Sequence, residues 1–187
     1  MSVTLVNMRI VIAHGASGDA ASMGAHVTGL AQRGIDATAI DLPLRKAEAA
    51  VPIYRETSLA MPEAPAQLVL SGQSYGGRVA SLLAAAEPDA YAGLVCFSYP
   101  LHRPGQPEWD ARSSHWPAIK VPVLLLSGES DPFARLELLN QAIEARLPTA
   151  RLVTYPKVGH SLKPVLDEAL DRVAEFMRDI VPQGQPG

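Results

Sequence analysis

The chain has 187 residues, of which 48% are hydrophobic and 19% charged, and its formal net charge is −3 at pH 7. This length and balance predict one globular domain, residues 1–187, with a core over about residues 8–180. The negative charge gives no electrostatic reason to bind nucleic acid, and no apolar stretch is long enough to cross a membrane. The single cysteine, Cys96, excludes a disulfide framework and a cysteine-based zinc site.

The two ends of the chain carry weaker signals. Residues 1–8 have no basic region ahead of a long apolar run, so we expect no signal peptide and expect cytoplasmic residence. Residues 3–6 predict an extra edge strand, and residues 182–187 predict a disordered tail.

Short apolar runs alternate with helical patterns along the rest of the chain. Strands are predicted at residues 8–13, 36–42, 67–71, 93–98, 121–127 and 151–155. Helices are predicted at 20–33, 47–60, 74–86, 133–146 and 164–180. Asp19 or Ser17 would cap the first helix and Gly34 would end it, and Pro52 predicts a break or late start in the second. The alternation predicts an α/β fold, a doubly wound sheet of about six mainly parallel strands with helices on both faces.

Residues 68–79 read Leu-Val-Leu-Ser-Gly-Gln-Ser-Tyr-Gly-Gly-Arg-Val, and they contain the most informative motif. An apolar strand runs into Gly72-Gln73-Ser74-Tyr75-Gly76, and a helix follows. A Gly-x-Ser-x-Gly turn in this context is typical of a nucleophile elbow, which exposes a serine at the tip of a sharp turn. The alternative is an ordinary turn serine.

Sites in parallel sheets lie at the carboxyl ends of the strands, where three further loops are expected. Asp131 follows the strand at 121–127, and His160 follows the strand at 151–155. With Ser74 they give the chain order Ser, Asp, His of the α/β-hydrolase arrangement. His160 would take the serine proton, and Asp131 would orient the imidazole. Glu129 is the second choice for the acid. His160 could instead cap the last helix, and Asp131 could cap the helix that follows it, either instead of orienting the imidazole or in addition.

Backbone N–H groups near the elbow are candidates for an oxyanion hole. Tyr75, directly after the nucleophile, would supply one donor, and Ala16 in the loop after the first strand would supply the other. His14 is expected to brace that loop. Gln73 and His102 are further candidates for lining the pocket, although a structural or surface role is the stronger expectation for His102.

Three larger side chains have two interpretations each. Arg78, in the first turn after the elbow, would bind a substrate anion or pair with a carboxylate. Trp109 and Trp116, in the proline-rich connection 99–120, would line an acyl pocket or simply pack that long loop.

The elbow, the His14-Gly15 loop, the 128–131 loop and Gly159-His160 together resemble an α/β-hydrolase of the dienelactone-hydrolase type, over about residues 8–180. This chain has Ser74 where those enzymes use a cysteine, and it lacks the two leading strands of a full-length α/β-hydrolase. Residues 15–19 and 98–102 are similar to the small testis-expressed-type α/β-hydrolase-like proteins. That family includes the hydrolase-like domain of a non-specific-lethal chromatin-complex subunit.

These observations predict a serine esterase or thioesterase that acts on a small-molecule ester or thioester through an acyl-enzyme. Such chemistry needs neither a metal nor an organic cofactor, so none is expected. The short connection 99–120 predicts an open pocket and short acyl groups. The alternative from another class is a hydrolase-like interaction module with an idle triad, and a peptidase or transacylase would use the same residues. The sequence is also compatible with a homodimer.

Overall fold

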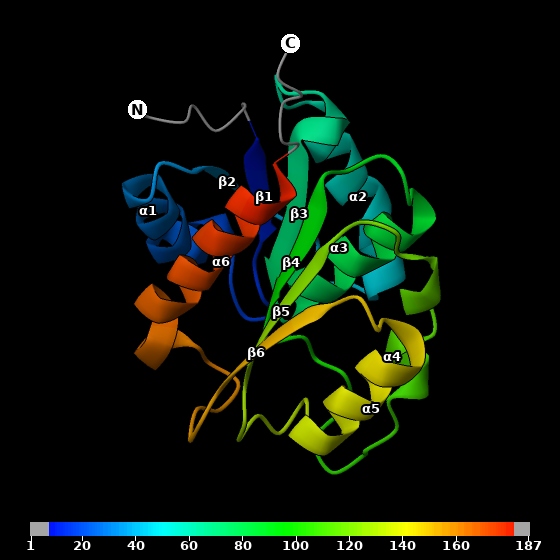
Figure 1. The fold of residues 1–187 in the computed structure, drawn as a ribbon. Helices are drawn as coiled ribbons and strands as arrows, with labels where there is room; N and C mark the ends of the chain where they lie inside the picture. The colour runs from blue at the N-terminus through cyan, green and yellow to red at the C-terminus, as the bar shows by residue number, and fades with distance from the viewer. Residues whose placement is uncertain (1–7, 182–187) are drawn as a thin grey trace.

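The computed structural model describes residues 8–181 and places a six-stranded, all-parallel sheet at the centre of the fold (Figure 1). The strand order is β2-β1-β3-β4-β5-β6. This confirms the predicted fold class. The strands are β1 (Arg9–Ala13), β2 (Asp36–Ile40), β3 (Leu68–Gln73), β4 (Gly93–Phe97), β5 (Val123–Gly128) and β6 (Arg151–Tyr155).

Helices cover both faces of the sheet (Figure 1). On one face lie α1 (Gly24–Gln32) and α6 (Leu166–Ile180). On the other lie α2 (Ala47–Leu59), α3 (Tyr75–Ala86) and α5 (Leu136–Arg146), together with the short α4 (Asp110–Ser113). Four short 3-10 turns complete the described elements: η1 (Ala20–Met23), η2 (Pro65–Gln67), η3 (Trp116–Ala118) and η4 (Lys163–Val165).

The central strands are largely apolar because each of their faces is buried against helices. Along β5, Val123 and Leu125 pack on the side of α2, α3 and α5, whereas Leu124 and Leu126 pack on the side of α1 and α6. Side chains alternate between the faces of a strand, so burial of both faces requires an unbroken apolar run. The predicted buried strands were recognisable for this reason.

The order of the strands fixes where the site lies. From β1 the chain moves to β2 on one side and then crosses back to β3 on the other side. The loops that follow β1 and β3 therefore diverge to opposite faces of the sheet and leave a crevice at its carboxyl edge. The loop with Gly15 and the turn with Ser74 are these two loops.

The structure corrects several element boundaries. The predicted helix 20–33 is the turn η1 followed by α1, with Asp19 as the cap of η1: its carboxylate accepts a 2.9 Å hydrogen bond from Ser22 N–H. Gly34 ends α1 with φ +73°, as predicted. The expected break or late start near Pro52 was wrong, because α2 is continuous from Ala47. Pro52 removes one backbone donor, and the rest of α2 stays in register through its buried side chains.

Other predicted helices begin later than expected. The helix predicted to begin at residue 133 begins at Leu136, because the Asp131 carboxylate accepts from Phe133 N–H and holds those residues in a turn. The last helix, predicted from residue 164, is η4 followed by α6. The strands at 67–71 and 121–127 are each shifted toward the carboxyl end, to β3 and β5.

Three predictions remain untested by the fold. The edge strand at 3–6 and the tail at 182–187 lie outside the described residues. Among residues 8–181, none of the helices combines the length and the apolar character needed to cross a membrane. Cytoplasmic residence stays a prediction.

Candidate active site

Ser74 lies at the tip of a strained turn between β3 and α3. Its φ of 49° is in the region that L side chains rarely adopt, and its N–H donates a 2.8 Å hydrogen bond to Phe97 O in β4. Such a conformation costs about 1–3 kcal/mol and persists only where the surroundings fix it. The turn therefore holds the serine in one position above the sheet edge.

The two glycines of the motif allow close contact between backbone segments, of β3 with the start of α3 and of α3 with the end of β1. A Cβ on Gly72 would lie 2.2 Å from Gly76 C, and a Cβ on Gly76 would lie 2.4 Å from Ala13 O at the end of β1. Real Cβ atoms do not approach backbone atoms so closely. The requirement for glycine at both positions is therefore steric.

Ser74, His160 and Asp131 form one continuous chain of hydrogen bonds. His160 Nε2 is 2.8 Å from Ser74 Oγ, and His160 Nδ1 is 2.8 and 3.0 Å from the two carboxylate oxygens of Asp131. An ionised carboxylate can only accept, so Nδ1 carries the proton and Nε2 is left to accept from the serine hydroxyl. The Asp131 side chain has no exposed surface, whereas 26% of the His160 side chain is exposed.

The loops that carry Asp131 and His160 are bonded to each other. Ser130 N–H donates to Val158 O at 2.9 Å, and Glu129 N–H donates to Tyr155 O at 3.0 Å. A Cβ on Gly128 would lie 2.2 Å from Val158 O, so glycine lets the two loops meet at this point. The separation of acid and base is thus fixed by backbone contacts.

A further contact on His160 was not expected from the sequence. The Phe133 ring lies 4.4 Å from the imidazole, centroid to centroid, at an interplanar angle of 37°. Asp131 holds this segment in place, because its Oδ1 accepts from Phe133 N–H at 2.8 Å. The Asp131 carboxylate therefore contacts the imidazole and also shapes the turn ahead of α5, in line with the expectation that one residue could do both.

The loop after β1 lies beside the elbow. The Cβ position of Gly15 is 3.7 Å from Gln73 O and 3.9 Å from Ser74 Cβ. His14 is buried, accepts from Leu42 N–H at Nε2 (3.0 Å) and donates from Nδ1 to Gly15 O (2.8 Å). This histidine braces the loop, and both of its ring nitrogens are occupied.

The N–H groups of Tyr75 and Ala16, which the sequence nominates as oxyanion donors, are free of backbone partners within residues 8–181. Tyr75 is the first residue of α3, so its N–H has no partner within the helix. Within residues 8–181, Ala16 N–H donates to no backbone oxygen either. The positive end of α3 adds to the attraction for an anion at this point.

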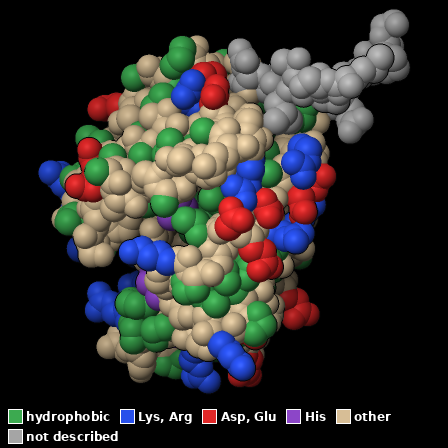
Figure 2. All heavy atoms as spheres, turned by 90° about the vertical axis from the view of Figure 1, so that its left-hand side faces the viewer, with side chains coloured by type: hydrophobic (Ala, Val, Ile, Leu, Met, Phe, Trp, Pro, Cys, Tyr) green, Lys and Arg blue, Asp and Glu red, His purple; other side chains and the backbone are tan. Residues whose placement is uncertain are grey.

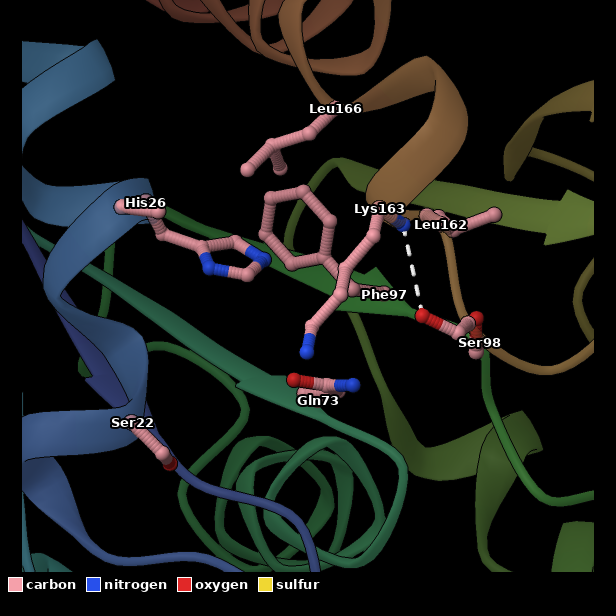
Figure 3. Close-up of a pocket in the computed structure, with 10 residues that line it drawn as sticks. Ser22, His26, Gln73, Phe97, Ser98, Leu162, Lys163 and Leu166 are labelled. Carbon is pink, nitrogen blue, oxygen red and sulfur yellow. Dashed lines mark hydrogen bonds between the residues drawn. The ribbon is translucent and has the colours of Figure 1, made fainter.

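A small cavity of about 60 Å³ lies on the α1 and α6 side of the elbow (Figure 3). Gln73 precedes Ser74, and Ser161 follows His160, and both line it. In Figure 3 the Lys163 side chain extends toward Gln73, while the ring of His26 lies beside Phe97. Figure 2 shows histidine atoms in the hollowed part of this face, with a Lys or Arg side chain near them.

Burial changes the titration of two side chains, His26 in the lining of the small cavity and Cys96 on the opposite face of the sheet. It lowers the pKa of His26 to about 4, so this histidine is neutral near pH 7. Burial likewise raises the pKa of the Cys96 thiol, which therefore stays protonated. Neither side chain is prepared for nucleophilic or proton-transfer chemistry near neutral pH.

The structure places the remaining sequence candidates away from the reacting atoms. Glu129 accepts from Thr154 and is exposed. Trp116 packs on Tyr99, and Trp109 lies under the Arg146 guanidinium, so both tryptophans pack the long connection. His102 is buried and accepts from Arg135 N–H, which is a structural role.

Arg78 pairs with Glu48 at 2.6 Å, but its Nε atom is buried without a partner. Within residues 8–181, no three His, Cys, Asp or Glu side chains are grouped so that they could hold a metal ion.

The family model of the alpha/beta hydrolase domain matches residues 6–180. The chain belongs to this family. Uncharacterized proteins from two strains of Mycobacterium tuberculosis are 29% identical over 135 residues, which is 65% of this chain and 48% of theirs. The chain therefore spans about half the length of these curated relatives.

Solved structures with hydrolase names share the fold of this alpha/beta hydrolase. The monoacylglycerol lipase of Paleococcus ferrophilus has a TM-score of 0.79 at 17% identity, covering 92% of this chain and 94% of the lipase. A dienelactone hydrolase of Anabaena variabilis has a TM-score of 0.74 at 19% identity, covering 93% and 87%. The thioesterase domain of the curacin biosynthetic pathway has a TM-score of 0.73 at 16% identity, covering 94% and 92%.

These findings confirm the α/β-hydrolase resemblance, including the likeness in fold to a dienelactone hydrolase. They give no support to the narrower resemblance to the testis-expressed type, which stays a prediction.

Proposed function

We propose that this α/β-hydrolase is a serine hydrolase that cleaves an ester or thioester of a small to medium substrate through an acyl-enzyme. The observation that carries the proposal is the continuous hydrogen-bond chain from Ser74 Oγ through His160 to Asp131, with 2.8 Å on each side of the imidazole. A nucleophile, a base and an orienting acid in this geometry are the arrangement that serine hydrolysis requires.

The reaction follows from these contacts. Ser74 Oγ attacks the carbonyl carbon while its proton passes to His160 Nε2. The C–O or C–S bond then breaks, and His160 returns the proton to the departing alcohol or thiol. Water attacks the acyl-serine by the same route in the second half, gives its proton to His160, and releases the carboxylic acid with Ser74 restored.

The negative charge of the tetrahedral intermediate would lie between the N–H groups of Tyr75 and Ala16. Donors held in place before the reaction stabilise such charge without reorganising, and the loss of one typically lowers the rate by about 10²–10³. His14 supports this role indirectly, because its contacts to Leu42 and Gly15 hold the loop that carries Ala16.

The size of the cavity favours short acyl groups. A volume of about 60 Å³ has room for only a few water-sized groups. The connection between β4 and β5 contains only the short α4 and η3 as regular helical structure. A long acyl chain would leave most of its length in water.

A panel of 4-nitrophenyl acetate, butyrate and palmitate tests this proposal, with acetylated and butyrylated thiols as the thioester counterparts. We expect turnover of the short esters or thioesters, and a loss of at least about 10³-fold in Ser74→Ala. Ser114→Ala, which alters an exposed serine far from the elbow in sequence, is the matched control and should retain full activity.

Turnover of palmitate without acetate or butyrate would contradict the proposed acyl size. Activity that survives in Ser74→Ala would contradict the mechanism. A folded chain with no turnover would favour the interaction module.

A further inference from the structure

A wide basic groove opens beside the first turn of α3, on the side of the sheet opposite the small cavity. It consists of two hollows of about 610 and 270 Å³, which share Arg78 and Arg103 as lining residues. Tyr75, next to the nucleophile, also lines the larger hollow. We call this feature the anion groove, and its basic residues are Arg45, Lys46, Arg78, Arg103 and Arg112.

Positive charge in the groove exceeds the negative charge that could neutralise it. The lining contains five basic side chains and two acidic ones, Glu48 and Glu108. Glu48 is engaged by Arg78. Within residues 8–181, no carboxylate forms an ion pair with Arg45, Lys46 or Arg103. The groove therefore has a net positive charge in a protein whose overall charge is negative.

The backbone presents Arg103 in a defined position. A tight turn joins it to Gln106, whose N–H donates to Arg103 O at 3.0 Å, and Gly105 adopts φ +72° in this turn. The same carbonyl accepts from Nδ1 of the buried His102 at 2.9 Å. His102 thus connects the turn to the segment before α5, where it accepts from Arg135 N–H.

The guanidinium groups of the groove are close enough to repel one another. The pKa of Arg112 is lowered by burial first, and then by the positive charges of Arg78 and Arg103. Arg112 is held in place by hydrogen bonds to Pro100 O and His102 O, so it does not turn away. An anion between these groups would offset this repulsion, in addition to making charge-assisted hydrogen bonds.

The groove lies within reach of the reacting serine. Arg78 is one helical turn beyond Ser74, and its N–H donates to Ser74 O at 3.0 Å. Tyr75, the residue directly after Ser74, lines the larger hollow together with Arg78. A group bound beside Arg78 can therefore belong to a molecule whose carbonyl lies at Ser74. The groove is open, as the departing half of a substrate requires, while the small cavity lies on the opposite side of the sheet.

We propose that the anion groove binds a negatively charged group, a carboxylate or a phosphate, on the alcohol or thiol side of the substrate. This inference rests on the proposed function and specifies its substrate class. Arg78 and Arg103 provide the central contacts, because they line both hollows. The acyl group of such a substrate would occupy the small cavity.

Three acetate esters of matched shape test this proposal. They are meta-carboxyphenyl, meta-phosphonooxyphenyl and neutral meta-carbamoylphenyl acetate, each followed by release of the phenol. We expect kcat/KM to be about tenfold higher for at least one anionic ester than for the neutral one. The preferred anion identifies carboxylate or phosphate as the group bound. The preference should shrink in 1 M NaCl, since salt screens exposed charges.

Arg103→Gln should lower this preference about fivefold or more, mainly through KM for the anionic ester. Arg103→Glu should reverse it. Arg178→Gln removes an exposed arginine on α6, on the opposite face of the sheet, and should leave the preference unchanged. Arg103 is exposed, so these variants are expected to fold, and a thermal melt checks this.

Equal or lower kcat/KM for both anionic esters would overturn the proposal. A preference that persists in Arg103→Glu would overturn it too. If a fluorophosphonate still labels Ser74 in that case, the proposed hydrolase function survives and only the anion groove fails. If Ser74 is neither labelled nor active on any of the esters, both proposals fail together.

Discussion

The backbone of Ser74 is strained because two glycines bring three segments of chain together around it. Ser74 has φ 49°, and the positions of Gly72 and Gly76 leave no room for a Cβ. The side chain of the nucleophile is thus set by the packing of β1, β3 and α3, so small changes in that packing should be visible at the serine.

Gly76→Ala is therefore expected to damage both stability and activity. Its Cβ would lie 2.4 Å from Ala13 O and 2.6 Å from His14 O, so either α3 or the end of β1 must move. We expect a loss of more than about 2 kcal/mol in the free energy of unfolding, measured in urea, and a loss of Ser74 labelling by a fluorophosphonate.

Gly24→Ala is the matched control for that substitution. Gly24 begins α1 with helical backbone angles, and nothing lies within 4 Å of its Cβ position. Alanine there should stabilise the protein by about 0.5–1 kcal/mol and leave labelling intact. A Gly76→Ala protein as stable and as reactive as Gly24→Ala would contradict the steric account of the elbow.

Asp131→Asn tests whether the carboxylate fixes the imidazole tautomer. The asparagine amide can donate to Nδ1, which would place the proton on Nε2 and prevent it from accepting from Ser74. We expect kcat to fall by about 10³–10⁴, with little change in KM. Glu129→Gln, two residues away and bonded to Thr154, should keep kcat within about twofold. Equal losses in the two variants would contradict the assignment of the acid.

At the scale of elements, α2 is fastened to the sheet by one buried hydroxyl. Tyr54 OH lies 2.6 Å from Val11 O in β1 and 2.8 Å from Ser71 O in β3, and it accepts from Ser71 N–H at 3.0 Å. These two strands flank the point where the chain diverges toward the site. One side chain therefore links α2 to the strands that carry the site loops.

Tyr54→Phe should lower the free energy of unfolding by about 1–3 kcal/mol, since it leaves buried backbone groups with one partner fewer. Tyr91→Phe is the control, because the Tyr91 hydroxyl bonds only the partly exposed Glu87, at 3.3 Å. We expect a change of less than about 1 kcal/mol there. Urea unfolding of both variants measures these changes. Equal changes in the free energy of unfolding would contradict the role given to Tyr54.

Elements also show why part of the fold could be predicted and part could not. Buried parallel strands such as β5 were recognisable because both faces demand apolar residues. The course of α2 through Pro52 was not, because tertiary packing outweighs the local preference of proline to end a helix. The order Ser74, Asp131, His160 placed three loops at one sheet edge. The position of Phe133 beside the imidazole and the hydrogen-bond partners of His14 depend on the paths of loops, which local sequence patterns do not predict.

The anion groove likewise depends on how distant segments of the chain come together, so the sequence could not predict it. Its basic residues come from the loop before α2, from α3, from the loop after β4 and from α4. Arg78 alone gave a hint in the sequence, through its place in the first turn after the elbow. Only the folded chain brings the other four beside it.

For the whole molecule, two histidines, the buried His26 and the half-buried His115, make stability depend on pH. Burial lowers the pKa of His26 to about 4, and burial together with the charge of Arg78 lowers that of His115 to about 4. In the unfolded chain both titrate near 6.5, so the unfolded state takes up protons first as the pH falls. The contribution of these histidines to the free energy of unfolding is therefore fully present above about pH 6.5, and it decreases as the pH falls from that value to about 4.

Urea unfolding of wild type at pH 7 and pH 4 should show this loss, and His26→Gln should show a smaller one. A pKa change of this size corresponds to about 3 kcal/mol for a buried group such as His26. Glutamine has no titrating group, so the variant lacks this share of the pH dependence. Identical losses in wild type and His26→Gln would contradict the account of a neutral buried histidine.

The most direct test of the central claim is fluorophosphonate labelling of wild type beside Ser74→Ala and His160→Ala, read by intact mass. An activated serine attacks the phosphorus, displaces fluoride and retains one phosphonyl adduct, while an ordinary hydroxyl does not react. The account predicts one adduct on wild type and none on either variant. A folded wild-type protein that gains no adduct, or an adduct that persists in Ser74→Ala, would contradict it.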